Sequence, residues 1–131
     1  MTIEVASSAL ETMRGQAALA HPRECCGILL GHENRIEAAL PARNVHPEPE
    51  RHFEIDPQAL FNAFRTARSG GPQVLGYYHS HPVGEAEPSG TDQQRALRDG
   101  SIWAIIAGLE VRLWSDDETG FAELSYLVSA A

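Results

Sequence analysis

The stretch that decides the fold covers residues 74–92 and reads VLGYYHSHPVGEAEPSGTD. Its first five residues are apolar or aromatic, which predicts a buried β-strand that runs into the histidines. Residues i and i+2 of a strand point to the same side, so His79 and His81 should converge while Ser80 faces away. Pro82 cannot donate to a strand ladder, so we expect the strand to end there.

The second half of this stretch predicts a loop that turns into a helix. The prolines and glycines after His81 favour the loop, and we expect the helix to run from about Ser89 to Arg98. Asp92 lies in its first turn, from where its carboxylate can be folded back onto the end of the strand. Two neutral imidazoles, from His79 and His81, and this carboxylate would make three ligands, which suits a catalytic zinc ion with its fourth position left to water.

Each feature also has an ordinary structural explanation. Two histidines near a strand end are usually polar groups at a sheet edge, and Ser-x-x-Asp before a helix is a capping box. Capping and catalysis are compatible for Ser89 and Asp92, since each side chain has spare lone pairs.

The spacing of the four residues taken together is more specific than any one of these features. His-Ser-His-Pro, seven residues from His81 to Ser89 and two more to Asp92, resembles the zinc signature of the JAMM (MPN-plus) metallopeptidases, and every fixed position of that signature is present.

The resemblance to the compact prokaryotic JAMM enzymes implies a fold and a reaction. The implied fold is a curved, mixed but mainly antiparallel sheet flanked by helices. His79, His81 and Asp92 would bind Zn²⁺, and Ser89 would help to stabilise the tetrahedral oxyanion. The implied reaction is hydrolysis of the amide bond after the C-terminal Gly-Gly of a ubiquitin-like or sulfur-carrier protein, with zinc-activated water as the nucleophile. The chain is too short for the insertions with which eukaryotic deubiquitinases of this family grip ubiquitin.

A general base is also needed, and Glu24 is the candidate. It lies at the mouth of the apolar run Cys25–Gly31, where burial would raise its pKa toward a useful value. From position alone, an exposed carboxylate at a helix end is the more ordinary interpretation. The segment Pro22–Gly31 resembles the glutamate-containing strand of the JAMM family, which implies that Glu24 is the base. Cys25 and Cys26 begin an apolar strand, so we expect them to serve in packing and not as nucleophiles.

The rest of the chain alternates short strands and helices, which predicts an α/β fold with helices packed against a mixed, mainly antiparallel sheet. Further strands are expected over residues 2–5, 25–31, 35–40, 53–55, 102–109, 111–114 and 121–128. Helices are expected from a cap at Ser7 or Ser8 to Pro22, and from Pro57, capped by Asp56, to Ser69–Pro72. The expected buried faces are Leu10, Met13, Ala17 and Ala20 in the first helix and Leu60, Phe61 and Phe64 in the second.

Composition narrows the classes of function. The 131 residues predict a single domain over 1–131, and the formal net charge is −8 with ten basic residues, all arginine. An acidic chain without a basic cluster is not expected to bind nucleic acid. We also expect no signal peptide and no membrane span, because no apolar run approaches the roughly 18 residues that a span needs. The adjacent cysteines are a poor disulfide pair, which favours the cytoplasm.

Three other classes compete with an active peptidase. An inactive scaffold of the same family would lack a ligand, and none is missing here. A RadC-like, DNA-repair-associated domain shares the His-x-His and Ser-x-x-Asp spacing, but the Glu24–Gly27 strand and the acidic balance favour the peptidase branch. A zinc nucleoside deaminase would need His-x-Glu and Pro-Cys-x-x-Cys, which this sequence does not contain.

Overall fold

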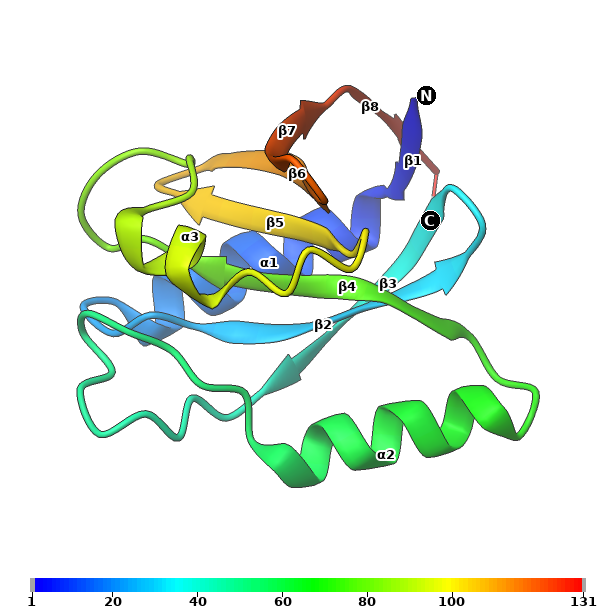
Figure 1. The fold of residues 1–131 in the computed structure, drawn as a ribbon, viewed down its shortest axis with the longest axis horizontal. Helices are drawn as coiled ribbons and strands as arrows, with labels where there is room; N and C mark the ends of the chain where they lie inside the picture. Colours follow the sequence, from blue (N-terminus) through cyan, green and yellow to red (C-terminus); the bar gives the residue numbers. More distant parts are fainter. Residues whose placement is uncertain (1, 131) are drawn as a thin grey trace.

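A computed structural model describes residues 2–130, which form one sheet of eight strands with three helices against it (Figure 1). The strands are β1 (Ile3–Ala6), β2 (Cys26–His32), β3 (Arg35–Ala42), β4 (Gln73–Ser80), β5 (Ile102–Ala107), β6 (Glu110–Asp117), β7 (Gly120–Leu124) and β8 (Tyr126–Ser129). The helices are α1 (Ser7–Ala20), α2 (Pro57–Arg68) and α3 (Gly90–Arg95). The two end residues of the domain expected over 1–131 lie outside the described residues. None of these helices is long and apolar enough to cross a membrane.

The sheet is mixed and strongly curved. Its strand order is β7-β6-β5-β4-β2-β3-β1-β8; β1 is parallel to β3 and β8, β4 is parallel to β5, and the other pairs are antiparallel. The two edge strands, β7 and β8, follow each other in the chain with only Ser125 between them, so the sheet must curl until its edges approach (Figure 1). The single strand expected over residues 121–128 is therefore wrong: Ser125 is the point where the chain leaves one edge and joins the other.

Helix α1 covers one face of the sheet and α2 the other. Leu10 and Met13 of α1 are buried in the larger core, together with Tyr78 of β4 and Ile106 of β5. Ala17 and Ala20, the other two members of the expected stripe, pack against that core while partly exposed. The cap expected at Ser7 or Ser8 is wrong, because β1 runs directly into the helix and Ala6 is the N-cap, without a side-chain hydrogen bond.

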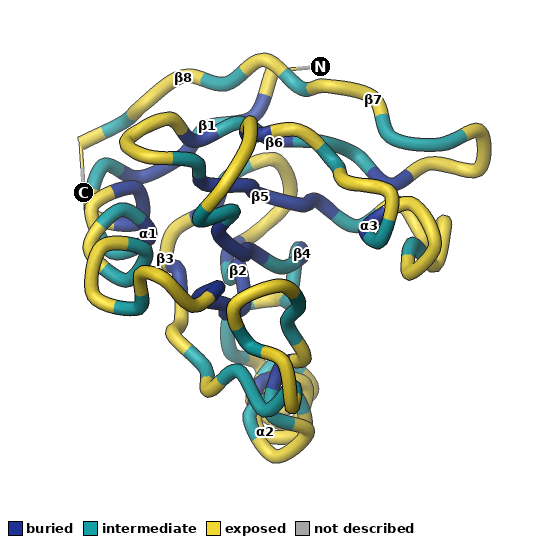
Figure 2. The backbone as a smooth tube through the Cα atoms, turned by 90° about the vertical axis from the view of Figure 1, so that its left-hand side faces the viewer, coloured by how far each residue is buried: buried dark blue, intermediate teal, exposed yellow. Residues whose placement is uncertain are grey.

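The buried face expected for α2 is confirmed at Leu60 and wrong at Phe61 and Phe64. Phe61 is 54% exposed and Phe64 is 41% exposed, and Ala63 is the residue of this helix that is fully buried. Leu60 packs beside Ala63 from three positions away, on the same stripe of the helix. The two phenylalanines each follow this stripe by one position, which rotates them by about 100° away from the sheet. Figure 2 shows α2 projecting from the molecule with much of its surface exposed.

Three further expectations are corrected by the structure. The helix expected to reach Arg98 ends at Arg95, because the backbone N–H groups of Leu97 and Arg98 donate to Oδ2 of Asp116 in β6. The strand expected over residues 53–55 is reduced to a single bridge between Ile55 and Asn44. The strands expected over 102–109 and 111–114 instead meet in a tight turn, which begins at Gly108 with a φ of 61°.

Candidate metal centre and active site

The structure brings His79, His81 and Asp92 together at one end of the sheet. His79 is the penultimate residue of β4, and His81 follows the strand directly, with its backbone N–H donating to Ile106 at 2.8 Å. Asp92 is the third residue of α3. Nε2 of His79 and Nε2 of His81 are 3.1 Å apart, and each lies 3.2 Å from Oδ2 of Asp92. We call these residues the His–His–Asp triad.

The orientation of one ring makes the centre of the triad a place for a cation. Nδ1 of His81 lies 2.8 Å from the carbonyl oxygen of Glu85, which can only accept, so we assign a hydrogen to Nδ1. In the neutral ring, Nε2 then turns its lone pair toward His79 and the carboxylate of Asp92. The triad therefore needs either a shared proton or a metal cation at its centre.

The spacing of the triad fits a tetrahedral metal ion. Bonds of about 2.0–2.2 Å would set neighbouring nitrogen and oxygen ligands of such an ion about 3.3–3.5 Å apart, close to the 3.1–3.2 Å observed. The three side chains are 1%, 9% and 5% exposed, respectively. Within residues 2–130 they are the group of possible ligands that lies within reach of a common metal ion. Two imidazoles and one carboxylate leave one tetrahedral position open.

Reciprocal hydrogen bonds at the start of α3 fix the carboxylate of the triad. Oγ of Ser89 accepts from the N–H of Asp92 at 3.1 Å, and the N–H of Ser89 donates to Oδ2 of Asp92 at 2.9 Å. This is the capping box that the sequence predicts. The Ser89 hydroxyl acts as an acceptor here, so its own hydrogen can still be donated to a bound group.

Glu24 lies across the β2–β4 ladder from the triad. In this antiparallel pair Cys26 is opposite His79, and the N–H of Ser80 donates to the carbonyl of Cys25 just beyond the ladder. Extending this register by one more position, back from Cys25 and on from Ser80, brings Glu24 to His81. Side chains two apart on a strand share a face, which places the Glu24 side chain on the same face as both histidines. Glu24 is only 8% exposed.

The two buried carboxylates of the site have opposite pKa shifts. Burial raises the pKa of Glu24 from 4.5 to about 7, and attraction to His81 only partly offsets this. Burial also opposes the ionisation of Asp92, but hydrogen bonds from His79 and His81 outweigh it and hold the pKa of Asp92 well below its usual range. Glu24 can therefore exchange a proton near neutral pH, whereas Asp92 remains an anion.

The two histidines also differ. Complete burial lowers the pKa of His79 despite its hydrogen bond to Asp92, which favours the neutral imidazole that a metal ion requires. Burial acts in the same direction on His81, but its contacts with Asp92 and the Glu85 carbonyl outweigh burial and raise its pKa. In the absence of a cation, His81 is thus the histidine that can supply the proton at the centre of the triad.

Aromatic rings enclose His79 on one side, which the sequence did not indicate. The Phe53 ring stacks on the His79 ring with centroids 4.2 Å apart and planes 18° apart, and the Trp103 ring meets it edge-on at 5.7 Å. Arg95 of α3 donates to the backbone carbonyl of Phe53, which ties the loop before α2 to the helix that carries Asp92. The three aromatic residues come from distant segments, so no local pattern could have revealed this contact.

Asn44 organises the loop beside Glu24 and was also missed. Its Nδ2 donates to the carbonyls of Glu24 and His52, both at 3.0 Å. Its Oδ1 accepts from the backbone N–H groups of His46 and Glu54, also at 3.0 Å. A single amide thus holds a loop that has no regular secondary structure. The frequent occurrence of asparagine in turns was the only available signal.

Cys25 and Cys26 are free and buried, which confirms their expected packing role. The N–H of Cys25 donates to Oγ of Ser80 at 2.8 Å, so Ser80 faces away from the triad, as the alternation in β4 predicts. Burial raises the pKa of Cys26 to about 12. Cys26 therefore stays a thiol at neutral pH and is unsuited to act as a nucleophile.

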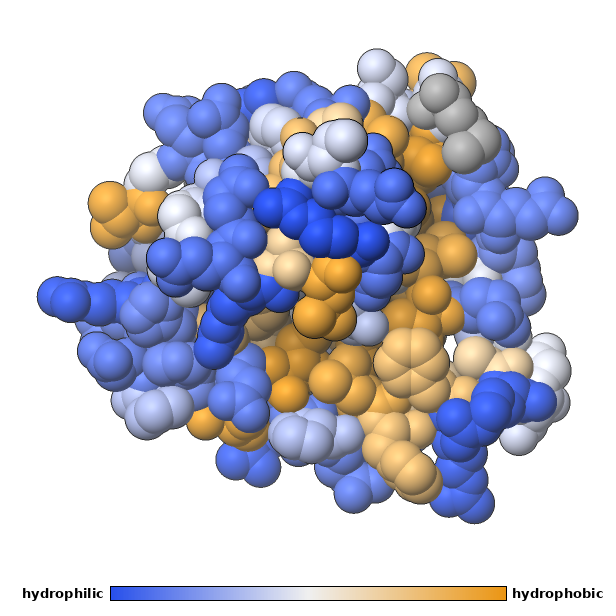
Figure 3. Space-filling model, in the orientation of Figure 1, coloured by the Kyte–Doolittle hydropathy of each residue, from blue (hydrophilic) through white to orange (hydrophobic). Residues whose placement is uncertain are grey.

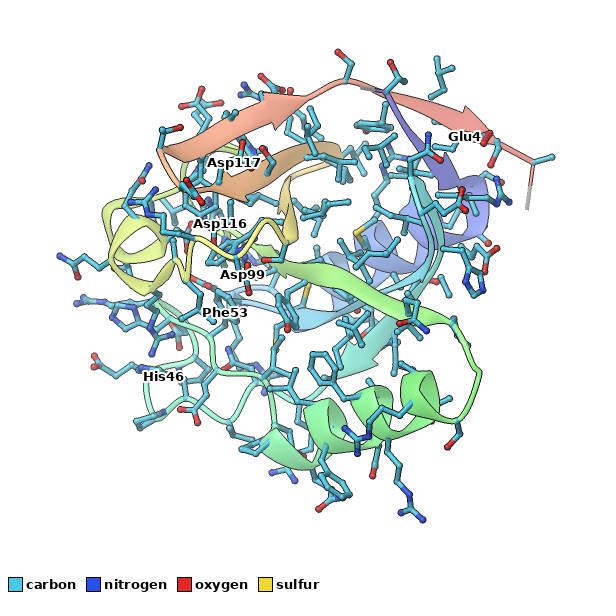
Figure 4. The ribbon with its side chains drawn as sticks, turned by 45° about the vertical axis from the view of Figure 1, so that its right-hand side comes forward. Glu4, His46, Phe53, Asp99, Asp116 and Asp117 are labelled. Carbon is cyan, nitrogen blue, oxygen red and sulfur yellow. The ribbon has the colours of Figure 1, made fainter. Side chains whose placement is uncertain are left out.

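Several cavities adjoin the site, including one of about 380 Å³ whose wall contains Glu24, and two others lie near the histidines. The first of these two, which we call the aromatic cavity, has a volume of about 420 Å³ and is lined by Phe53, Trp103 and Tyr77 together with Asp99 and Asp116. Apolar residues gather at the centre of this face of the molecule (Figure 3). Figure 4 shows Phe53, Asp99 and Asp116 following one another along the cavity. Because Phe53 and Trp103 also contact His79, this cavity lies beside the triad.

The second cavity, which we call the arginine cavity, has a volume of about 560 Å³. It lies between α1, the end of β4 and the turn from β5 to β6, and His81 is part of its wall. Arg14 and His21 are its other ionisable lining residues. Ser80, which faces away from the triad, also lines this cavity, so it lies on the α1 face of the sheet, whereas the aromatic cavity lies beside Phe53 and Trp103.

Comparison with known proteins gives the family. A family model described as prokaryotic homologs of the JAB domain matches residues 6–117. The chain is 34% identical over 133 aligned positions to the desampylase of Haloferax volcanii, covering 98% of this chain and 94% of that protein. It is 34% identical over 96 positions to the probable TtuB-protein conjugate cleaving protease of Thermus thermophilus, covering 73% of this chain and 64% of that protein.

A solved structure supports the same conclusion for the fold. The crystal structure of a JAB1/MPN domain protein from Archaeoglobus fulgidus matches with a TM-score of 0.62 at 19% identity, covering 96% of this chain and 97% of that chain. This likeness confirms the expected α/β fold with a curved mixed sheet flanked by helices. The family match spans most of the chain and includes every residue of the site. The chain therefore belongs to the prokaryotic homologs of the JAB domain and is an enzyme of the JAMM peptidase type, as its motif predicts.

Proposed function

We propose that this chain is a zinc-dependent peptidase that cleaves the amide bond after the C-terminal Gly-Gly of a small ubiquitin-like or sulfur-carrier protein. The observation that carries the proposal is the His–His–Asp triad with Glu24 on the same face of the sheet, because this combines a metal site with a carboxylate whose pKa is about 7. The Thermus relative is named as a protease that cleaves protein conjugates, which supports the substrate class.

His79, His81 and Asp92 would hold the zinc ion. Bound there, zinc would polarise the scissile carbonyl and lower the pKa of a coordinated water. The protein prepares its ligands for this role: burial favours the neutral imidazole of His79, the Glu85 carbonyl orients His81, and Ser89 orients Asp92.

Glu24 would carry the proton during the reaction. Its pKa of about 7 lets it take a proton from the attacking water and give that proton to the leaving amine. A carboxyl group with an ordinary pKa would return the proton less readily. Glu24 lies outside the triad, so it can exchange this proton without giving up a metal ligand.

Ser89 would stabilise the oxyanion that forms at the scissile carbonyl. Its oxygen is occupied by the N–H of Asp92, which leaves the hydroxyl hydrogen as the group that can be donated. A donor held in place by the capping box needs no reorganisation when the oxyanion forms, which is the property that makes such donors effective.

The substrate is proposed from the space around the triad. Glycine on the carbonyl side leaves room for both the metal ion and Ser89, and it lets the substrate backbone approach the protein closely. The aromatic cavity would receive the residues before the Gly-Gly, because it lies beside His79 and offers an apolar wall. A short tail alone gives little contact, so the recognised body should be a folded carrier protein.

The test is cleavage of a carrier that bears a C-terminal extension. Zinc-loaded enzyme is mixed with the carrier, and the product masses are read. We expect one cut, after Gly-Gly, and the same cut slowed by ~10²–10⁴ in the Glu24→Gln enzyme. A carrier whose Gly-Gly is replaced by Val-Val should remain intact. If cognate carriers stay uncut while unrelated unfolded peptides are cleaved readily, the enzyme is instead a general peptidase.

The cytoplasm is the compartment we propose for this activity. Cys25 and Cys26 are neighbours in the chain, buried and unpaired with each other. A reducing compartment keeps such thiols free without a further device. Labelling of whole cells with an antibody to the protein, compared with fractionated periplasm and cytoplasm, tests this assignment.

A further inference from the structure

The loop of residues 82–88 joins two parts of the metal site, because His81 precedes it and the capping box of Asp92 follows it. It leaves the end of β4 and returns at α3 (Figure 1). Its carbonyl at Glu85 lies 2.8 Å from Nδ1 of His81. Within residues 2–130, no backbone–backbone hydrogen bond holds this loop, and Val83 near its start is 90% exposed. Contacts from outside the loop must therefore keep the Glu85 carbonyl in place.

Trp114 of β6 supplies such a contact. Its Nε1 donates to the carbonyl of Ala86, the residue after Glu85, at 3.1 Å. Ala86 is fully buried, whereas its neighbours Glu85 and Glu87 are exposed. A buried carbonyl that loses its donor is costly, so this bond fixes the loop at its buried position. Two successive carbonyls of the loop are thus held, one by His81 and one by Trp114.

Arg112 holds the indole ring of Trp114 in turn. The two residues are two apart on β6 and share a face, and the guanidinium carbon of Arg112 lies 5.0 Å from the centre of the Trp114 ring. Arg112 donates to both carboxylate oxygens of Glu123 in β7, at 2.8 and 2.7 Å, which fixes the guanidinium plane. Its Nη1 also donates to Glu87 of the loop at 3.2 Å. This last pair is exposed to solvent and adds less than the bond to Ala86.

The two tryptophans of the chain support different histidines. Trp103 and Trp114 lie directly opposite each other in the β5–β6 ladder, so their side chains share a face of the sheet. The Trp103 ring meets His79 edge-on at 5.7 Å. Trp114 reaches His81 indirectly, through the backbone of residues 85–86. One cross-strand pair therefore supports both imidazoles of the His–His–Asp triad.

We propose that Trp114 is a positioning residue of the metal site, which holds residues 85–86 so that the Glu85 carbonyl keeps His81 directed at the zinc ion. This inference rests on the proposed function. A neutral imidazole has two tautomers, and only the one with its hydrogen on Nδ1 offers the Nε2 lone pair to the centre of the triad. Without the bond from Trp114, the Glu85 carbonyl is free to move away, and His81 loses the partner that selects this tautomer and this ring orientation.

The first test is zinc affinity, measured by competition with a chelator of known affinity. Trp114→Phe keeps an aromatic ring beneath Arg112 and removes the N–H, and it should raise the dissociation constant for zinc by about tenfold or more. Arg112→Gln should raise it by about two- to fivefold, as expected for an exposed ion pair. Tyr126→Phe is the matched control, because the Tyr126 hydroxyl also donates to a backbone carbonyl of β6, that of Val111, at 2.7 Å. It should keep the wild-type affinity.

Exchange of a side-chain hydrogen with solvent separates positioning from a general loss of stability. In zinc-loaded protein labelled with ¹⁵N, the Nδ1 hydrogen of His81 should exchange about tenfold faster in Trp114→Phe than in wild type, because the loop that covers it opens more often. The ring hydrogen of His79 should exchange as in wild type, since Phe53 and Trp103 still enclose that ring. Tyr126→Phe should leave both rates unchanged.

The two measurements together decide the inference. Wild-type zinc affinity in Trp114→Phe would overturn it, and so would an equal loss of affinity in Tyr126→Phe. Weaker zinc binding with unchanged exchange at His81 would also overturn it, because Trp114 would then act by another route. If Trp114→Phe does not fold, Arg112→Gln is judged by the same two measurements. If wild type itself binds no zinc, the proposed function fails, and exchange at His81 in the metal-free protein still decides whether Trp114 holds the loop.

Discussion

The start of β2 and the start of α3 each bury one carboxylate on the same face of the sheet, but they prepare it for opposite tasks. At Glu24 burial dominates and raises the pKa to about 7. At Asp92 the N–H of Ser89 and the imidazoles of the triad outweigh burial and lower the pKa. The hydrogen-bond donors around a buried carboxylate, and not its burial alone, thus separate a proton carrier from a permanent anion.

Removing the permanent anion should have the largest effect. We expect Asp92→Ala to abolish turnover and to weaken zinc binding strongly. The loss in affinity should exceed the roughly 10–100-fold that is lost when a group hydrogen-bonded to a metal ligand is removed. Metal analysis after dialysis against a weak chelator, with wild type holding about one equivalent, measures this. Asp117→Ala removes an exposed carboxylate of β6 and should behave as wild type. An Asp92→Ala protein that retains a full equivalent of zinc would show that Asp92 is not a ligand.

Ser89, which holds Asp92 in place, should have the next largest effect. As an oxyanion donor, Ser89→Ala should lower turnover by ~10²–10³ with little change in KM, and as a helix cap it should cost ~1 kcal/mol of stability. Asp56 caps α2 through a hydrogen bond from Gln58, so Asp56→Ala is the control that loses a cap far from the chemistry. If both variants lose stability and neither loses rate, Ser89 is a cap only.

The raised pKa of Glu24 predicts a pH-dependent difference in stability. Between pH 4.5 and about 7 the folded, metal-free protein keeps a proton on Glu24 that the unfolded chain has released, so stability falls as the pH rises through this range. Glu24→Gln lacks this loss. In thermal melts with chelator present, the variant should match wild type below pH 4.5 and melt above it at pH 8. If the variant and wild type have the same melting temperature at pH 8 as well as below pH 4.5, burial of Glu24 does not disfavour its ionised form.

The aromatic wall should matter less than the ligands themselves. Phe53→Leu removes the ring stacked on His79 and should weaken zinc binding by about tenfold, the lower end of the effects seen when support for a ligand is lost. Phe64→Leu is the matched control, because Phe64 is 41% exposed on α2. Titration of both variants against a zinc indicator measures the affinities. An unchanged affinity in Phe53→Leu would assign the ring to the aromatic cavity alone.

Local rules were sufficient for the parts of the site that are close in sequence. Alternation along β4 predicts that His79 and His81 share a face with Ser80 turned away, and the Ser-x-x-Asp pattern predicts the capping box that positions Asp92. Glu24 is different, because its position across from His81 depends on the pairing of two strands. For Glu24 the resemblance to the JAMM family had to supply what periodicity could not.

Tertiary contacts account for what the sequence did not reveal. Asp116 ends α3 early by accepting two backbone N–H groups from another part of the chain. Phe61 and Phe64 look like core residues by composition, but the stripe of α2 that meets the sheet runs through Ala63. Phe53 reaches His79 from a loop without regular structure. In each case the deciding partner lies far away in the sequence.

The central claim is that Glu24 carries a proton while Asp92 remains an anion that binds zinc. Its most direct test is the Glu24→Gln enzyme, with zinc content and turnover measured on the same sample. We predict about one equivalent of zinc and a turnover reduced by 10²–10⁴, because only the proton carrier is lost. Glu118→Gln, which changes an exposed carboxylate of the turn after β6, should retain both. Near-normal turnover in zinc-loaded Glu24→Gln would contradict the account and place the base elsewhere, and loss of zinc would make Glu24 part of the metal site.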